Sequence, residues 1–152
     1  MDNLQLFLAH AIELERDAAR RYEELTEAMR TAGNAEVEAF FKQMAHFSRR
    51  HLKEAMQRGG FHMLPALAAD QWQWPDGSSP EAAAWEGVDG LIDAQAAIGI
   101  ALDSERRGLS YYRALAASST DAEVRHMALV FAGEEAEHVE QLEAWQQRLL
   151  EA

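Results

Sequence analysis

The chain contains no cysteine among its 152 residues. This absence excludes disulfide bonds, thiolate zinc sites, iron–sulfur clusters and a cysteine nucleophile, and leaves carboxylates and six histidines as candidate metal ligands. Basic residues are also few, since 14 Lys and Arg stand against 26 Asp and Glu and give a formal net charge of −12. We therefore expect neither a nucleic acid nor an anionic membrane surface as a partner.

Long hydrophobic runs are missing as well. No stretch reaches the roughly 18 uncharged apolar residues of a membrane span, and the N-terminus lacks the basic flank and apolar segment of a signal peptide. Hydrophobic residues nevertheless make up 48% of the chain, which is enough to build one buried core. We expect one cytoplasmic domain spanning residues 1–152.

Turn signals divide the chain at residues 31–34, at about 59–90 and at 118–121, and long helical patterns fill the rest. The two short turns predict antiparallel helix hairpins. The middle segment of about 30 residues is long for a connection in a compact domain and predicts a crossover along the bundle. The expected fold is an all-α antiparallel four-helix bundle in which two helix hairpins are joined by this crossover.

Two turns carry recognisable helix caps. Asn34 is expected to cap the second helix, and Thr120 and Glu123 stand at the spacing of a capping box, in which the hydroxyl and the carboxylate satisfy opposite backbone N–H groups. Residues 76–80 predict a turn into a short helix capped by Ser78 or Ser79.

The crossover is unusual in composition, because it holds all three prolines and three of the four tryptophans. These tryptophans are Trp72, Trp74 and Trp85. We expect them to pack the crossover onto the helices, and a ligand or partner site is the alternative.

The two halves of the chain are alike. Residues 11–16 match residues 101–106 at an offset of 90, and the second and fourth helical patterns align at an offset of 87, which places His51 on His138. The pattern indicates a helix hairpin that is duplicated in the sequence.

Each helical pattern carries an apolar stripe that faces the core, and polar residues interrupt every stripe at its midpoint. The interrupting residues are Glu15, Ser48, His51, Glu105, Glu135 and His138. One unpaired buried carboxylate costs several kcal/mol, whereas a whole domain is stable by only about 5–15 kcal/mol. The three carboxylates therefore need protons, charged histidines or a central cation.

Convergence from four helices favours the cation, although a single carboxylate or histidine in such a place would not. Glu135 and His138 are three residues apart, so they project from one helix face and can bind the same ion. Oxygen and imidazole ligands without sulfur suit iron or manganese, with zinc possible. The histidines that fall off the stripes are not expected to bind metal, and they are His10, His46, His62 and His126.

The residues resemble the ferritin-like superfamily, in particular the rubrerythrin-like di-iron carboxylate proteins, through Ala-Ile-Glu-Leu-Glu15-Arg, Ala-Leu-Asp-Ser-Glu105-Arg and Ala-Gly-Glu-Glu135-Ala-Glu-His138. That family takes one Glu from each of two helices and a Glu-x-x-His from each of the others. The resemblance implies Glu15 and Glu105 as terminal ligands, Glu135 as a bridging ligand, and two imidazole ligands. The imidazoles would be those of His51 and His138.

The resemblance also assigns roles beside the ligands. Tyr22 and Tyr112 look like hydrogen-bond donors to the ligands, and packing as core aromatics is the alternative. Rubrerythrins carry a further Glu where this chain has Gly108, and a four-cysteine rubredoxin module that a chain without cysteine lacks. A separate protein would have to donate electrons.

Ser48 stands where the family pattern requires a second bridging Glu. Three carboxylates then face the four positive charges of two divalent ions, so we expect two-metal occupancy to be weakened. We hypothesise that one ion binds at Glu105, Glu135 and His138. A second ion, near Glu15 and His51, would need a water or hydroxide bridge beside Ser48.

Three functions remain open at this point. The first is an oxidoreductase that reacts with oxygen or peroxide or oxidises ferrous iron, with one or two iron ions per chain. The second is a metal-binding module with a degenerate site and no turnover. The third is a structural bundle without metal that binds a partner. A homodimer is expected, because ferritin-like bundles commonly pair.

Overall fold

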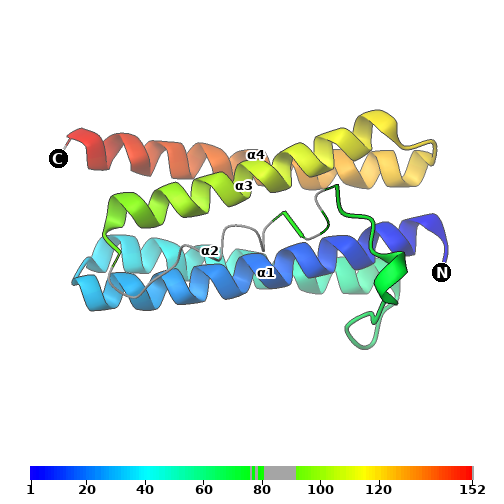
Figure 1. Cartoon of the computed structure of the whole chain (residues 1–152), viewed down its shortest axis with the longest axis horizontal. Helices are drawn as coiled ribbons and strands as arrows, with labels where there is room; N and C mark the ends of the chain where they lie inside the picture. Colours follow the sequence, from blue (N-terminus) through cyan, green and yellow to red (C-terminus); the bar gives the residue numbers. More distant parts are fainter. Residues whose placement is uncertain (76, 78, 81–91, 152) are drawn as a thin grey trace.

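The computed structural model describes residues 1–75, 77, 79–80 and 92–151 (Figure 1). The elements within these residues are the α-helices α1 (Asn3–Ala32), α2 (Ala35–Gly59), α3 (Ala94–Ser118) and α4 (Ala122–Glu151), with the short 3-10 helix η1 (Ala69–Gln71) between α2 and α3. None of the described helices is long and apolar enough to cross a bilayer. The predicted all-α four-helix bundle is confirmed.

The helices pair as two hairpins, because α1 packs along α2 and α3 packs along α4 (Figure 1). Gly33 ends α1 and Gly60 ends α2 with positive φ angles of 74° and 69°. Glycine suits both positions because it lacks the Cβ atom that makes this backbone conformation unfavourable. The hairpin α1–α2 therefore turns sharply at Gly33, and the chain leaves it for the crossover at Gly60.

The caps of the two short turns differ in how well the sequence predicted them. The side chain of Asn34 accepts a hydrogen bond from the N–H of Val37, as expected. The predicted capping box at Thr120 is wrong, because Oδ1 of Asp121 accepts from the N–H groups of Glu123 and Val124 at 2.9 and 3.2 Å. A carboxylate is the stronger acceptor here, since its charge also interacts favourably with the helix dipole.

The predicted apolar stripes are buried over most of their length, and aromatic contacts join the two hairpins. Phe7 of α1 stacks on Phe131 of α4 with ring centroids 5.7 Å apart, and it also packs edge-on against Tyr112 of α3 at 6.1 Å. A stripe is normally only one face of a bundle helix. In α1, however, a second face is also buried, and it includes Ala9, His10 and Asp17.

Part of this second face is covered by the crossover. The ring of His10 lies 5.1 Å from Trp72 and 4.6 Å from Trp74, and Trp74 also packs on Tyr111 at 5.3 Å. Nδ1 of His10 donates to the carbonyl of Leu6, and Nε2 accepts from the backbone N–H of Gln73, both at 2.8 Å. Trp72 and Trp74 therefore pack the crossover onto the bundle, as predicted.

Two further expectations for the crossover fall on residues outside the described part. They are the contacts of Trp85 and the short helix that Ser78 or Ser79 would cap, of whose predicted segment only Gly77, Ser79 and Pro80 are described.

Candidate metal centre

The polar side chains that interrupt the stripes lie at one level of the bundle, in the middle of the four helices. Glu15 comes from α1, Ser48 and His51 from α2, Glu105 from α3, and Glu135 and His138 from α4. All are buried except His51, whose side chain is 15% exposed. The heptad-like spacing of each stripe places them there, since the same helix faces build the core above and below.

Three of these residues form a compact group in the α3–α4 hairpin. Glu105, Glu135 and His138 each offer one ligand atom, and these atoms lie within 4.8 Å of one another. Nδ1 of His138 is 3.6 Å from Oε2 of Glu105, which is too long for a hydrogen bond. A separation of this size suits two ligands that share an ion.

The unpartnered atoms of this group support the same conclusion. Oε2 of Glu105, Oε2 of Glu135 and Nδ1 of His138 are buried and have no hydrogen-bond partner in the described part of the chain. Buried polar atoms without partners are rare and costly. Two carboxylates and an imidazole that face one another in this way fit a bound divalent cation.

The other two candidate ligands lie in the α1–α2 hairpin. Nδ1 of His51 is 3.8 Å from Oε1 of Glu15, and the ring of His51 stacks on His138 with centroids 5.5 Å apart. The two hairpins therefore bring their candidate ligands together. Among the described residues, however, Glu15 and His51 belong to no group of three potential ligands of the kind formed by Glu105, Glu135 and His138. At this level α2 contributes Ser48, whose buried hydroxyl lacks a hydrogen-bond partner in the described chain.

Two residues of α1, in the other hairpin, donate hydrogen bonds to Glu105. The hydroxyl of Tyr22 donates to Oε1 of Glu105 at 2.7 Å, and Nη2 of Arg21 donates to the same oxygen at 3.2 Å. Tyr112 is the counterpart of Tyr22 in the sequence repeat, but its buried hydroxyl has no partner among the described residues. The two tyrosines therefore differ in their role, although the repeat predicts the same role for both.

Sequence reasoning missed Arg21, which is 0% exposed. The chain did contain a signal, because Phe7, Leu14 and Ala28 are apolar and stand at seven-residue intervals that include position 21. All three are buried. A seven-residue repeat marks one helix face, so a charged residue within it is a candidate for burial.

The three buried carboxylates of the layer differ in how readily they ionise. It raises the pKa of Glu15 to about 8, with the negative charge of Glu105 adding to the effect, and it raises the pKa of Glu135 well above its usual value. Burial also opposes ionisation of Glu105, but the nearby polar groups of Glu135 and His138 and the positive charge of Arg21 outweigh it and hold the pKa of Glu105 well below its usual range. Without a cation, the negative charge resides mainly on Glu105.

Glu134 is a second residue that sequence reasoning missed. Its Oε2 lies 3.6 Å from Nε2 of His51, and its side chain is 29% exposed. Burial, followed by the neighbouring His138, lowers the pKa of His51, which favours the neutral ring that a metal requires. A carboxylate beside Nε2 leaves Nδ1 of His51 facing the layer. The sequence contained a signal for Glu134, because this residue directly precedes the candidate ligand Glu135.

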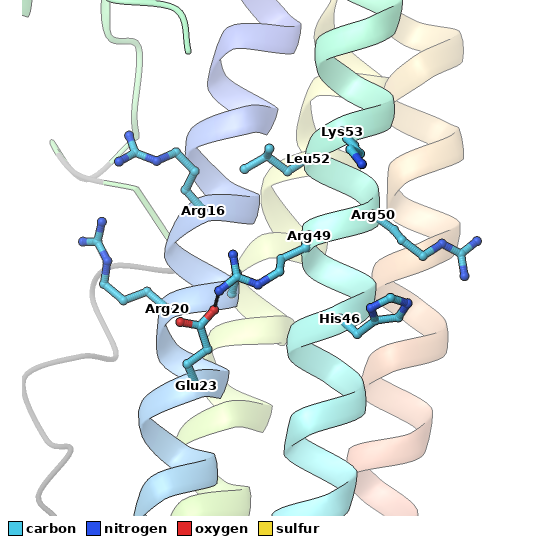
Figure 2. Close-up of a pocket in the computed structure, with 9 residues that line it drawn as sticks. Arg16, Arg20, Glu23, His46, Arg49, Arg50, Leu52 and Lys53 are labelled. Atoms are coloured by element: carbon cyan, nitrogen blue, oxygen red, sulfur yellow. Dashed lines mark ion pairs between the residues drawn. The ribbon is translucent and has the colours of Figure 1, made fainter. Parts of the chain in front are cut away.

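A basic groove lies outside the bundle, on the surface that α1 and α2 share (Figure 2). Arg49 of α2 reaches across to an ion pair with Glu23 of α1. The cations that line the groove are Arg16, Arg20, Arg49, Arg50 and Lys53. Arg49 and Arg50 directly follow Ser48 and precede His51, so the groove lies outside the same helical turn that faces the metal layer.

Comparison with known proteins gives the same fold. A family model described as Rubrerythrin matches residues 7–58, which span most of α1 and α2. The crystal structure of an uncharacterized conserved protein from Magnetospirillum magnetotacticum MS-1 is 39% identical in sequence, covers 97% of this chain and 95% of that chain, and has a TM-score of 0.77. No curated protein matches the chain. The family model and the 39% identical relative, whose likeness spans nearly the whole chain, together show that this protein belongs to the rubrerythrin family.

Proposed function

We propose that this protein binds iron in its carboxylate–histidine layer and is an oxidoreductase that reacts with oxygen or peroxide, or that oxidises ferrous iron. The observation that carries the proposal is the buried group of Glu105, Glu135 and His138, whose facing atoms lack hydrogen-bond partners in the described chain. Membership of the rubrerythrin family supports it. Manganese and zinc are the alternative ions.

The residues around the group supply what such chemistry needs. Bound iron would provide the redox change and open coordination positions for a small oxidant. Tyr22 and Arg21 fix Glu105 from the opposite hairpin, which limits how far this carboxylate moves. Burial of the layer restricts access to water and small molecules, since His51, which is 15% exposed, is the most accessible of the candidate ligands.

A separate protein is proposed as the electron donor, because the chain has no cysteine for an iron–sulfur module. The basic groove of Arg16, Arg20, Arg49, Arg50 and Lys53 supports docking of an acidic donor (Figure 2). Opposite charges speed the encounter of two proteins, and the effect falls as salt is added. A donor in the groove would be ~10 Å from the metal layer, which is the diameter of one helix.

Reduced rubredoxin is a suitable acidic probe for this docking. With the iron-loaded protein and peroxide, its oxidation is expected to slow several-fold in Arg20→Glu/Arg49→Glu, and to slow in the parent as salt rises. The matched control is Arg106→Glu/Arg107→Glu, which changes the same charge on α3 away from the groove. Equal slowing in the two variants, or a rate independent of salt, would reject the groove as the docking surface.

The proposed reaction is tested by anaerobic loading with ferrous iron, followed by oxygen or peroxide. We expect an absorbance change for ferric iron within the protein, and its loss in Glu135→Gln. Bound iron that stays ferrous would favour the metal-binding module without turnover. Absence of bound iron, manganese or zinc would leave the structural bundle.

Two further proposals come from the sequence and family resemblance. We propose a homodimer, which native mass spectrometry would detect as twice the 17.0 kDa chain mass. We also propose a cytoplasmic location, which cell fractionation tests. A monomer at micromolar concentration would contradict the first proposal, and recovery outside the cytoplasmic fraction the second.

A further inference from the structure

The metal layer contains a built-in cation. Arg21 is completely buried, and Nη2 of its guanidinium lies 3.2 Å from Oε1 of Glu105. The guanidinium also lies over the ring of Tyr22, 4.5 Å from its centroid. Arginine keeps its charge in proteins, so this side chain brings a permanent positive charge to the candidate ligands.

The charge of the layer then matches one divalent ion. With a metal bound, Glu15, Glu105 and Glu135 contribute three negative charges, and Arg21 removes one of them. The remainder of two negative charges balances one divalent ion, whereas two ions would leave two positive charges in excess. An uncompensated charge in a buried site is strongly unfavourable.

The position of Arg21 agrees with this count. Arg21 and Tyr22 both bind Oε1 of Glu105, so only Oε2 of that carboxylate faces His138. This carboxylate therefore has one oxygen left for a metal ion, and its other oxygen is shared with the positive charge of Arg21. On the other side of the layer, Ser48 supplies a hydroxyl where a second bridging carboxylate would add a negative charge.

Glu134 does not restore the missing charge inside the layer. Its side chain is 29% exposed, and its Oε2 lies 3.6 Å from Nε2 of His51, on the opposite side of the ring from Nδ1. Partly exposed charges are screened by solvent more than fully buried ones. Glu134 therefore compensates a second ion less than a buried bridging carboxylate at position 48 would.

We infer that the centre holds one divalent ion per chain, at Glu105, Glu135 and His138, and that the guanidinium of Arg21 takes the place of a second metal ion in the charge balance. The inference rests on the proposed function, because it assumes that the layer binds metal. The inference predicts one ion per chain where a di-iron centre holds two, so counting the bound ions distinguishes them.

The test is metal stoichiometry of the full chain. Metal-free protein is loaded anaerobically with excess ferrous iron, freed of unbound ion, and measured by elemental analysis and native mass spectrometry. We expect one ion per chain in the parent. Two ions would overturn the inference while leaving the proposed function standing, and no ion would overturn the proposed function itself.

Variants test the role of Arg21 separately. Arg21→Met/Ser48→Glu changes the layer to four negative charges and is expected to bind two ions, whereas Arg21→Lys keeps the positive charge and is expected to bind one. One ion in a double variant that circular dichroism shows to be folded, or two ions in Arg21→Lys, would overturn the role of Arg21. If the double variant does not fold, the counts in the parent and in Arg21→Lys still decide the inference.

Discussion

The hydroxyl of Tyr22 donates a 2.7 Å hydrogen bond to Oε1 of Glu105, a residue 83 positions away in the other hairpin. The bond is completely buried and joins α1 to α3 at the level of the candidate ligands. Because Arg21 binds the same oxygen, α1 holds one side of this carboxylate while the other side faces His138. The link therefore belongs both to the packing of the hairpins and to the metal centre.

The first prediction concerns this link. Tyr22→Phe removes a hydrogen bond to a charged, buried carboxylate, and such bonds contribute about 1.5–3 kcal/mol. We expect the free energy of unfolding to fall by that amount in the metal-free protein, as measured by urea denaturation. Metal affinity is expected to fall about 10–100-fold, since loss of partners that orient ligands has effects of that size.

Tyr112→Phe is the matched control, because its hydroxyl is buried without a partner in the described chain. Removal of an unpaired buried hydroxyl costs little and can stabilise, so we expect an unchanged or slightly higher free energy of unfolding in the metal-free protein. Equal losses in the two variants would contradict the difference between the tyrosines.

The second prediction concerns metal removal. A ligand that binds only the folded chain stabilises it by about 2.7 kcal/mol at a concentration 100 times its dissociation constant. We expect a chelator to lower the melting temperature of the metal-loaded parent by several degrees. Glu135→Gln removes one ligand charge from the group, and its melting temperature should respond little to either metal or chelator.

The stripes made the main features of this fold predictable. Each stripe follows the helical period, so its polar midpoint predicted a common level in the core before any contact was known. The structure does place Glu15, Glu105, Glu135 and His138 there in the core. The long connection and its tryptophans likewise predicted a crossover packed on the helices, and Trp72 and Trp74 confirm it.

Other features depend on contacts that one helix cannot reveal. Burial of His10 follows from the crossover, whose path over α1 is not encoded in the period of α1. Arg21 is acceptable in the core because Glu105 of another hairpin balances its charge. Whether Thr120 or Asp121 caps α4 depends on a difference of one residue in where the helix starts. Sequence patterns place helix ends only to within a few residues.

The third prediction tests the corrected cap of α4. Asp121→Ala removes the acceptor for the N–H groups of Glu123 and Val124, and loss of such a cap costs about 1 kcal/mol. Thr120→Ala should change the free energy of unfolding by less than about 0.5 kcal/mol, since Thr120 is exposed. If urea denaturation shows a larger loss of unfolding free energy in Thr120→Ala than in Asp121→Ala, the capping box at Thr120 would be supported instead.

The fourth prediction concerns pH. Burial lowers the pKa of His10 below its usual value, against a smaller raising effect of the Leu6 carbonyl, so the folded chain keeps this ring neutral. Its Nε2 accepts from Gln73, and protonation would remove that acceptor. The stabilisation is therefore present above about pH 6.5 and is lost as the pH falls below it.

Hydrogen exchange at the backbone N–H of Gln73 measures this effect residue by residue. After correction for intrinsic exchange rates, protection should fall between about pH 7.5 and 5.5 in the parent. In His10→Asn, protection should be low and nearly independent of pH. Constant protection in the parent over this range would show that His10 does not control the attachment of the crossover.

The most direct test of the metal centre is a crystal structure of the protein loaded with ferrous iron, with anomalous scattering recorded at the iron edge. The account predicts an anomalous peak inside the bundle, at bonding distance from ligand atoms of Glu105, Glu135 and His138. Iron found only on the surface, or a layer without an anomalous peak after loading, would contradict it.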